Sequence, residues 1–420
     1  MPPADTASQV TVLGGGAVGL CTALELTGRG IPVRLIDRDA PGQGASMGNA
    51  GVISPFSVVP QSMPGVWKKA PGWLLDPLGP VTVHARHLPR FLPWALDFLR
   101  SGRVDRVRQI SLGMHALSDG SVDIYRQHLA GTGHEALLQD SCYVLAHRNP
   151  DTARDTGFDS ELRRAAGAKV EVIGDAALRE MEPDLSPEFR AAVVIHGQAR
   201  TTSPGRLMQV LADKLRATGG EILSHEVKAL RPGTDGGWQI DCEGTTLQAA
   251  RIVLSAGAWS AQLLKPLGLK LPLEAERGYH VMFADPGVRL NNSVMDTDRK
   301  FVASSMEQGI RAAGTAEFGG LDKPPDPRRA EVIAKLARQM LPGLNTASRT
   351  TWSGIRPSFA DSLPVISEIP DHPGLYGAFG HSHYGLMMAP RTGRIVADLL
   401  NGAPPNVDLS PYRVDRFGSV

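Results

Sequence analysis

The stretch Gly14-Gly15-Gly16-Ala17-Val18-Gly19 lies between the apolar run Val10–Leu13 and an apolar segment through Leu24 and Leu26 that is compatible with a helix. Glycine at the first, third and sixth positions lets a strand turn sharply into a helix whose free N–H groups and positive end face a pyrophosphate. The next strand, Val33–Asp37, ends in a carboxylate 18 residues after Gly19, where it can accept a hydrogen bond from a ribose hydroxyl. The first βαβ unit therefore predicts a site for the ADP half of a dinucleotide.

The context of the glycine motif makes it informative, because glycine-rich turns are common in a chain with 46 glycines. A strand precedes the motif, a helix follows it, and Asp37 ends the next strand. The alternative is a glycine turn that binds nothing. An acid at position 37, with no arginine in its place, favours an unphosphorylated ribose, and hence FAD or NAD over NADP.

Length and charge set broad limits on function. With 420 residues the chain can bury a large core, and two or three domains are expected. Lys and Arg number 44 against 43 Asp and Glu, a formal net charge of +1, so charge predicts no nucleic-acid partner and no attraction to an anionic membrane.

Cys21, Cys142 and Cys242 are far apart and form no metal-binding pattern, which favours buried thiols in a reducing compartment and predicts neither disulfides nor a metal site. The segment Met1–Gln9 is short and polar, which is not typical of a signal peptide. No segment reaches the roughly 20 apolar residues of a transmembrane helix. We expect a cytoplasmic protein, with peripheral contact at the inner face of the cytoplasmic membrane left open.

The segment Ser54–Leu99 interleaves prolines with Trp67, Trp73 and Trp94. Prolines this dense exclude long helices at its start, while Phe91–Leu99 predicts one short amphipathic helix. The tryptophans beside Lys68-Lys69 are compatible with a membrane-contacting patch, but we favour packing within a second domain.

The nucleotide domain resumes after Thr202, where Pro204 begins an amphipathic helical pattern. Short strands are predicted at 226–230, 238–242 and 251–255, and the last leads into Ala256-Gly257-Ala258-Trp259-Ser260. This second small-residue turn after a strand strengthens the prediction of a bound dinucleotide.

Residues 271–314 alternate in strand fashion and predict the sheet of a second domain, followed by a helix over 331–340. The C-terminal part of the sequence predicts a strand at Leu375–Phe379, followed by the loop Gly380-His381-Ser382-His383-Tyr384-Gly385-Leu386 and a helix through 395–400.

Five motifs in this order resemble the FAD-dependent amino-acid oxidase and dehydrogenase family, whose members include D-amino-acid oxidases, glycine and sarcosine oxidases and bacterial D-amino-acid dehydrogenases. They are Gly14–Gly19, Asn49–Pro55, Val253–Trp259, Trp352–Pro357 with Asp361 and Pro364, and Gly380–Leu386. Asn49–Pro55 and the proline-rich segment after it are most similar to the bacterial D-amino-acid dehydrogenase branch.

The resemblance implies an α/β glutathione-reductase-type FAD-binding Rossmann domain, discontinuous in sequence, and an α+β substrate domain whose mixed or antiparallel sheet covers the flavin. We expect residues 1–54, 200–271 and 350–420 to form the FAD-binding domain. Residues 55–199 and 272–349 are expected to form the substrate-binding domain.

The resemblance also implies which residues contact FAD. They are Gly14, Gly16, Ala17, Val18, Gly19, Asp37, Arg38, Ser46, Asn49, Ala50, Gly51, Val227, Ala256, Gly257, Trp259, Arg356, Gly380, His381, Ser382, His383, Tyr384, Gly385 and Leu386. Val227 would meet the adenine through its backbone, and the loop Gly380–Leu386 would stabilise negative charge on the reduced flavin with main-chain donors. We expect noncovalent FAD, because no cysteine lies in a flavin motif.

Arg356 corresponds in the resemblance to the arginine that binds the substrate carboxylate. A guanidinium holds a carboxylate through two parallel hydrogen bonds and so fixes the carbon next to it. That fixation places the Cα hydrogen within about 3.5 Å of flavin N5, which takes the hydride. The alternative is a surface or structural arginine.

Three further residues are predicted near the substrate. Arg277 would add a second cation and Tyr279 a hydroxyl to the same carboxylate, or Arg277 would form an ion pair with Glu274 or Glu276. His383, beside the proposed flavin edge, would take the ammonium proton as a general base, or would shape the loop and contact the flavin, which we favour.

We therefore expect an enzyme that oxidises the Cα–N bond of an amino acid of D configuration to an imine and 2-oxo acid, with electrons passed to a quinone, another carrier or O2. One alternative is a secondary-amine or imino-acid enzyme acting on hydroxyproline, sarcosine-like substrates or opines. Another is a non-catalytic FAD-binding subunit of a larger complex. The oligomeric state is left open.

Overall fold

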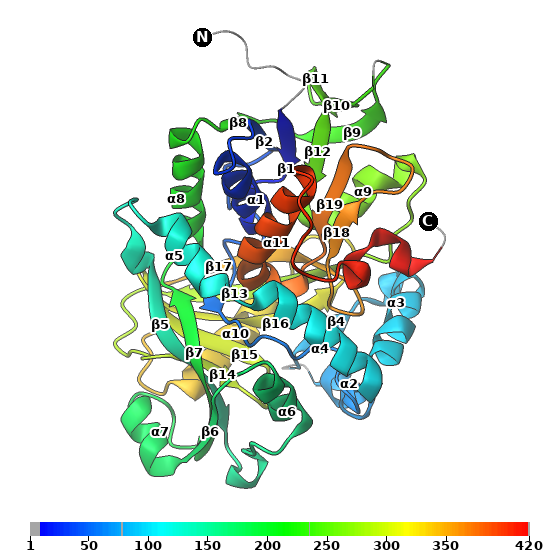
Figure 1. The fold of residues 1–420 in the computed structure, drawn as a ribbon. Helices are drawn as coiled ribbons and strands as arrows, with labels where there is room; N and C mark the ends of the chain where they lie inside the picture. Colours follow the sequence, from blue (N-terminus) through cyan, green and yellow to red (C-terminus); the bar gives the residue numbers. More distant parts are fainter. Residues whose placement is uncertain (1–8, 77–78, 235, 419–420) are drawn as a thin grey trace.

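A computed structural model describes residues 9–76, 79–234 and 236–418 (Figure 1). Residues 1–8, on which the expectation of no signal peptide rests, and Pro77 of the proline-rich segment lie outside the described residues. Within the described ranges, no helix combines the length and the apolar character needed to cross a membrane.

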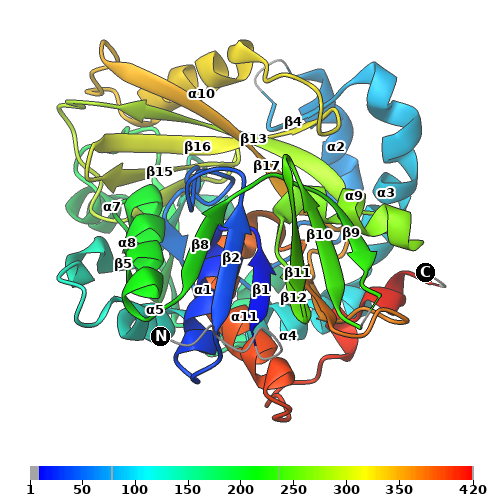
Figure 2. The same ribbon diagram turned by 90° about the horizontal axis from the view of Figure 1, so that it is seen from above.

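The first layer is a six-stranded sheet in which five strands are parallel and β18 is antiparallel. In spatial order its strands are β18 Val365–Glu368, β19 Leu375–Phe379, β12 Arg251–Leu254, β1 Val10–Leu13, β2 Val33–Asp37 and β8 Glu221–Ser224. One face is covered by helices α1 Ala17–Thr27, α8 Pro204–Ala217 and α11 Gly385–Leu400 (Figure 2). The other face packs against a small sheet of β9 Val227–Pro232, β10 Trp238–Cys242 and β11 Thr245–Ala249.

The pattern of buried residues explains which elements pack on each face of this sheet. In β1, Val10 and Val12 belong to the core beneath the helices, while Leu13 packs toward the small sheet, as the alternation of side chains in a strand requires. α1 approaches α11 closely at Gly393, where an added Cβ would lie 2.7 Å from the backbone of Cys21. The predicted Rossmann-type layer is confirmed, and its strands come from three separate parts of the chain, as predicted for a layer that is discontinuous in sequence.

The second layer is a larger mixed sheet that lies across one end of the first (Figures 1 and 2). In spatial order its strands are β17 Arg349–Ser358, β13 Glu274–Phe283, β16 Gly309–Phe318, β15 Phe301–Met306, β14 Ser293–Asp296, β5 Leu138–His147, β7 Ala191–Thr201 and β3 Val52–Ile53, with β4 Val81–Val83 on β16 and β6 Val170–Gly174 on β7. Helices α10 Pro327–Met340 and α7 Asp175–Met181 contribute to the core of this layer.

Two strands of the larger sheet come from segments that the predicted boundaries assign to the nucleotide domain. β3 pairs with β7, and β17 pairs along its whole length with β13. The hydrogen-bonded ladder, rather than the neighbouring sequence, decides where these strands lie. As a result, the loop before β3 and the end of β17 both reach the space between the two layers.

Helices dominate residues 66–129: α2 Val66–Leu75, α3 Leu88–Ser101, α4 Val104–Ser118 and α5 Ser121–Leu129. Two shorter helices are α6 Phe158–Ala165 and α9 Ser260–Leu264. The predicted helix over 91–99 lies inside α3, whose Trp94 is buried against Phe318 of the larger sheet. α2 and α3 lie side by side at the edge of the molecule in both views.

Candidate FAD and substrate site

One cavity of about 1420 Å³ runs between the two layers. Its lining begins at Asp37 and Glu226 beside the ends of β2 and β9, passes the N-terminus of α1, and reaches the loop Gly380–Leu386. The carboxyl ends of the parallel strands thus face the cavity, which is where ligands bind to open α/β sheets.

The glycine motif builds the middle of the cavity from backbone. Gly14 has φ +108°, and a Cβ there would lie 2.4 Å from the carbonyl oxygen of Ser255. At Gly19 a Cβ would lie 1.9 Å from the carbonyl oxygen of Gly14, so only glycine lets α1 begin this close to β1.

The N-terminus of α1 is open to the cavity. Its N-cap, Gly16, supplies no capping side chain, and the Ala17 N–H donates to Ser46 Oγ at 3.0 Å. A helix end with free N–H groups and a positive partial charge suits a pyrophosphate.

The end of the cavity that is predicted to hold the ribose and adenine carries Asp37. Asp37 accepts hydrogen bonds from the Gly15 N–H at 2.5 Å and the Asp39 N–H at 3.0 Å, which orient the carboxylate at the cavity wall. The Arg38 guanidinium stacks on the Trp259 ring at 4.1 Å from its centroid, and both residues line the cavity.

The opposite end holds two buried hydroxyls without hydrogen-bond partners among the described residues. Ser382, 5% exposed, has φ +50°, and Thr315 on β16 has φ +61°. Both line the cavity. Strained backbone and unsatisfied buried polar groups together mark a place where a polar ligand belongs. The residues present therefore fit a dinucleotide whose polar ring system lies at this end.

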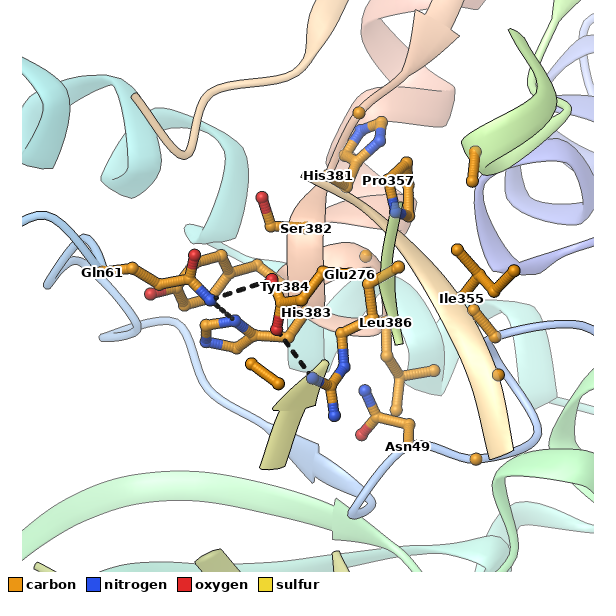
Figure 3. A pocket seen from close by; sticks show the side chains of 18 of the residues that line it. Asn49, Gln61, Glu276, Ile355, Pro357, His381, Ser382, His383, Tyr384 and Leu386 are labelled. Carbon is orange, nitrogen blue, oxygen red and sulfur yellow. Dashed lines mark hydrogen bonds and ion pairs between the residues drawn. The ribbon is translucent and has the colours of Figure 1, made fainter. Parts of the chain in front are cut away.

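His381 faces away from Glu276 and His383 (Figure 3). Its Nε2 lies 3.0 Å from Thr392 Oγ1 on α11, and burial lowers its pKa to about 3, so the ring is neutral. This hydrogen bond connects the loop Gly380–Leu386 to α11.

Arg356 and Glu276 are directly paired residues on β17 and β13, and both line the cavity. Arg356 Nη1 donates to Glu276 Oε1 at 2.7 Å and to the carbonyl oxygen of Thr315 at 3.0 Å. Its guanidinium lies over Gly278, where a Cβ would come within 2.0 Å of Nη2. Within the described ranges, Nε and Nη2 of Arg356 have no hydrogen-bonding partner. The edge of the guanidinium that carries these two nitrogens is therefore available to a carboxylate.

Glu276 is the centre of a buried network (Figure 3). Its Oε2 accepts from Ser358 Oγ at 2.7 Å and from Gln61 Nε2 at 3.4 Å, and Gln61 Nε2 lies 2.8 Å from His383 Nδ1. Because an ionised carboxylate only accepts, the amide nitrogen of Gln61 faces both groups. His383 Nδ1 is therefore an acceptor, and the ring proton is on Nε2.

The pKa shifts agree with this arrangement. Burial alone would raise the pKa of Glu276, but the charge of Arg356, the charge of His383 when protonated, and the hydrogen bonds from Ser358 and Arg356 outweigh it and lower the pKa. Burial lowers the pKa of His383 to about 4. The network therefore consists of an ionised Glu276, a charged Arg356 and a neutral His383.

Arg277 and Tyr279 are not brought to the cavity. They lie one and three residues after Glu276, and side chains at odd spacings on a strand point to the opposite face. Arg277 Nη2 donates to the carbonyl oxygen of Lys323 at 2.6 Å. The Tyr279 hydroxyl donates to Glu317, and burial raises its pKa.

The other interpretation of Arg277, an ion pair with Glu274 or Glu276, is not observed among the described residues either. Glu276 is paired with Arg356, and Glu274 Oε1 lies 2.7 Å from His87 Nε2. Arg277 instead fastens the loop around Lys323 to β13.

Nearly all the residues predicted to contact FAD line the cavity; Gly19 and Gly51 do not. Gly19 acts through close packing on Gly14. Gly51 has φ +83°, and its backbone N–H donates to Asn49 Oδ1 at 2.8 Å, which shapes the turn before β3. Among the described residues, none of the three cysteines lines the cavity, and no cluster suited to a metal ion is found.

Gln61 and Glu276 are the site residues that sequence reasoning missed. Gln61 lies in the proline-rich segment, where no motif marks it, and Glu276 was considered only as a partner of Arg277. Alternation along β13 predicts that Glu276 and Arg277 point to opposite faces of the strand. The pairing of Glu276 with Arg356, however, depends on the register between two strands whose paired residues are 80 positions apart.

Comparison with known proteins decides the family. The model of the family described as FAD dependent oxidoreductase matches residues 9–399. The chain belongs to this family. A D-amino-acid oxidase of Bradyrhizobium diazoefficiens is 36% identical over 97% of this chain and 98% of the relative. A D-amino acid dehydrogenase of the same organism is 31% identical over 97% of this chain and 99% of the relative.

A solved structure agrees with the fold. Glycine oxidase from Geobacillus kaustophilus superposes with a TM-score of 0.73 at 24% identity, over 97% of this chain and 99% of that one. The match to the family model over residues 9–399 confirms the predicted family and the predicted use of FAD. When bound, FAD supplies a ring that accepts two electrons and a proton as a hydride.

Proposed function

We propose that this FAD-dependent oxidoreductase oxidises D-amino acids at the Cα–N bond, giving an imine that water hydrolyses to a 2-oxo acid. Two relatives, similar over nearly their whole length, are named for D-amino acids. The observation that carries the proposal is the free Nε and Nη2 edge of Arg356, held at the cavity wall by Glu276 and Thr315.

In this proposal Arg356 binds the substrate carboxylate and thereby orients the Cα–H bond. The guanidinium cannot swing freely, because Nη1 is bonded on two sides and Gly278 lies beneath it. Such prior fixation is the main contribution a protein makes to hydride transfer. His383, neutral and bonded to Gln61, positions the site rather than removing the ammonium proton.

The residues predicted for FAD are proposed to hold it without a covalent bond. The N-terminus of α1 and Ser46 would bind the pyrophosphate, Asp37 the ribose, and the loop Gly380–Leu386 the flavin edge. We also propose the division into an FAD-binding and a substrate-binding domain. β3 and β17 come from the segments predicted for the FAD-binding domain, pair with the larger sheet, and so connect the two domains beside the proposed substrate site.

We further propose a membrane quinone as electron acceptor. Six large apolar side chains of α2 and α3, each 46–59% exposed, form what we call the α2–α3 apolar face: Trp67, Leu74, Leu88, Leu92, Leu96 and Leu99. The exposed cations Lys68, Arg86 and Arg90 accompany them. Trp67, Leu74 and Leu99 also line the cavity, so the cavity opens at this face. An apolar surface with cations suits an anionic lipid surface.

The oxidation itself is tested by anaerobic mixing of the purified yellow protein with a substrate panel. D-amino acids should bleach the flavin absorbance, and L-enantiomers should not. Bleaching only by sarcosine, hydroxyproline or opines would replace the proposed substrate class with secondary amines. Absence of bleaching by every amine would contradict the proposed function.

Membrane binding, which a membrane quinone as acceptor requires, is tested with vesicles containing phosphatidylglycerol. The wild type should sediment with the vesicles, and Leu92→Glu combined with Leu96→Glu should abolish sedimentation while anaerobic bleaching is kept. Val172→Glu is the matched control, because Val172 is also exposed but lies on β6, far from this face. Equal sedimentation of all three proteins would contradict the membrane proposal.

A further inference from the structure

Glu276 has no direct role toward the substrate in the function proposed above, yet it is an ionised carboxylate, 2% exposed, at the substrate end of the cavity. Burial of a charge is costly unless the charge is paired and hydrogen-bonded, and the ion-pair partner of Glu276 is Arg356, the same group that is proposed to bind the substrate carboxylate. The other carboxylates among the described lining residues lie elsewhere. Asp37, Asp39 and Glu226 belong to the ribose end, and Asp159 on α6 is paired with Arg163 at 2.6 Å.

Holding Arg356 in place does not by itself require the negative charge of Glu276. The carbonyl oxygen of Thr315 already fixes Nη1, and the strand pairing of β13 with β17 fixes the backbone. A neutral acceptor would orient Nη1 equally well without adding a negative charge. Arg356 must also neutralise the substrate carboxylate, so a second cation would be needed to balance the charge on Glu276 once substrate is bound.

Charge balance indicates where that cation comes from. Arg356 and Glu276 together are neutral, so a simple carboxylate would bring the buried site to a net charge of −1, with two carboxylates sharing one guanidinium. Like charges in a dry site repel strongly. A zwitterion keeps the sum at zero, because its ammonium group offsets its own carboxylate.

The geometry leaves room for that contact. A carboxylate has about four acceptor positions. Glu276 uses one at Oε1 for Arg356 and two at Oε2 for Ser358 and Gln61. One acceptor position at Oε1, next to the guanidinium, therefore has no donor among the residues that the structure describes. In an α-amino acid a single carbon separates the amino group from the carboxylate, so both groups fit one adjacent cation and anion pair.

We propose that Glu276 binds the amino group of the substrate, so that Arg356 and Glu276 form a dipolar clamp that selects α-amino-acid zwitterions over other carboxylates. The proposal rests on the function proposed above. It assigns substrate selection to a residue on β13 that no local motif marks.

The test uses two probes of nearly equal shape. 2-Aminoisobutyrate is a zwitterion without a Cα hydrogen, so it binds without being oxidised. Pivalate (2,2-dimethylpropanoate) has a methyl group in place of the ammonium group. Binding of each to the FAD-loaded protein is measured from the perturbation of the flavin absorbance and by calorimetry. The wild type should bind 2-aminoisobutyrate at least about tenfold more tightly than pivalate, the expected worth of a charged hydrogen bond.

Glu276→Gln separates the clamp from a purely structural role. The substitution should weaken 2-aminoisobutyrate about tenfold or more and leave pivalate unchanged or bound more tightly, because the repulsion is gone. Equal weakening of both probes would overturn the proposal, since Glu276 would then only position Arg356. Asp159→Asn, a change at a carboxylate elsewhere in the same cavity, is the matched control and should leave both affinities unchanged.

Two further results keep the test decisive. If Glu276→Gln does not retain FAD, the wild-type preference decides alone, and tighter binding of pivalate than of 2-aminoisobutyrate overturns the proposal. Arg356→Met tests the function on which it rests. Both probes should lose affinity, and if neither does, the carboxylate-binding role of Arg356 fails, whatever Glu276 does.

Discussion

The two ends of the cavity are built in different ways. The end proposed to bind the nucleotide is formed mainly by backbone groups of one short segment, in which Gly14–Gly19 and Asp37 lie within 24 residues of each other. At the substrate end, the side chains of Gln61, Glu276 and Arg356 come from three distant parts of the chain.

This difference predicts different responses to mutation. A site made of tightly packed backbone tolerates no added atom, because the backbone has nowhere to move. A site made of side chains can lose one group and keep the fold and the cofactor, while binding and rate change.

The largest effect is expected at the nucleotide end. In Gly19→Ala the new Cβ would meet the carbonyl oxygen of Gly14 at 1.9 Å, so α1 must shift and the pyrophosphate site is lost. The purified protein should be colourless. Gly174→Ala is the control, because a Cβ there meets nothing within 4 Å. Full flavin content in Gly19→Ala would contradict the account of this end.

Arg356→Met should retain FAD but lower kcat/KM for a D-amino acid about 10³-fold, because the carboxylate loses its bidentate partner in a partly buried site. Arg277→Met, on the paired strand but outside the cavity, should change kcat/KM less than about threefold. Steady-state rates and flavin absorbance measure both. The reverse order of the two effects would show that the substrate lies on the other face of β13.

Gly278→Ala should have a smaller effect, because it displaces the clamp without removing it. The added Cβ would come within 2.0 Å of Arg356 Nη2, so the guanidinium must turn. We expect KM to rise about 10-fold to 100-fold with flavin content unchanged. An unchanged KM would mean that the position of Arg356 over Gly278 does not matter for binding.

The smallest effect per residue concerns stability and pH. Burial lowers the pKa of His383 and His128 to about 4, and of His280 and His381 to about 3, from 6.5. Between these values and pH 6.5 the unfolded chain binds more protons than the folded one, so stability falls as the pH is lowered. At pH 5.5 each ring should cost about 1 kcal/mol relative to neutral pH.

Denaturant unfolding at pH 7.5 and pH 5.5 measures this change. His381→Asn removes one such ring, so the loss of stability between the two pH values should shrink. A loss as large as that of the wild type would show that His381 is not held neutral by burial.

Much of the nucleotide end could be predicted because its determinants are local. The turn from β1 to α1 needs glycine at fixed spacings, and Asp37 follows at a fixed distance, so the sequence alone predicts both. The strands 238–242, 251–255 and 375–379 are also predicted well, because they are short apolar runs bounded by small or polar residues.

The substrate end could be predicted only in part. Arg356 was found through a resemblance, but the roles suggested for Arg277 and Tyr279 depended on which face of β13 points inward, and a strand buried on both faces gives no such information. The helices and strands of residues 100–199 were not predicted, since no motif marks them. Gln61 reaches Glu276 only through a tertiary contact across 215 residues.

The most direct test of the account is a crystal structure of the FAD-bound protein soaked with 2-aminoisobutyrate. The carboxylate should lie on Nε and Nη2 of Arg356 over the flavin ring, with the amino group within hydrogen-bonding distance of Glu276. A probe bound on the opposite face of β13, or an Arg356 side chain turned away from the flavin, would contradict the central claim.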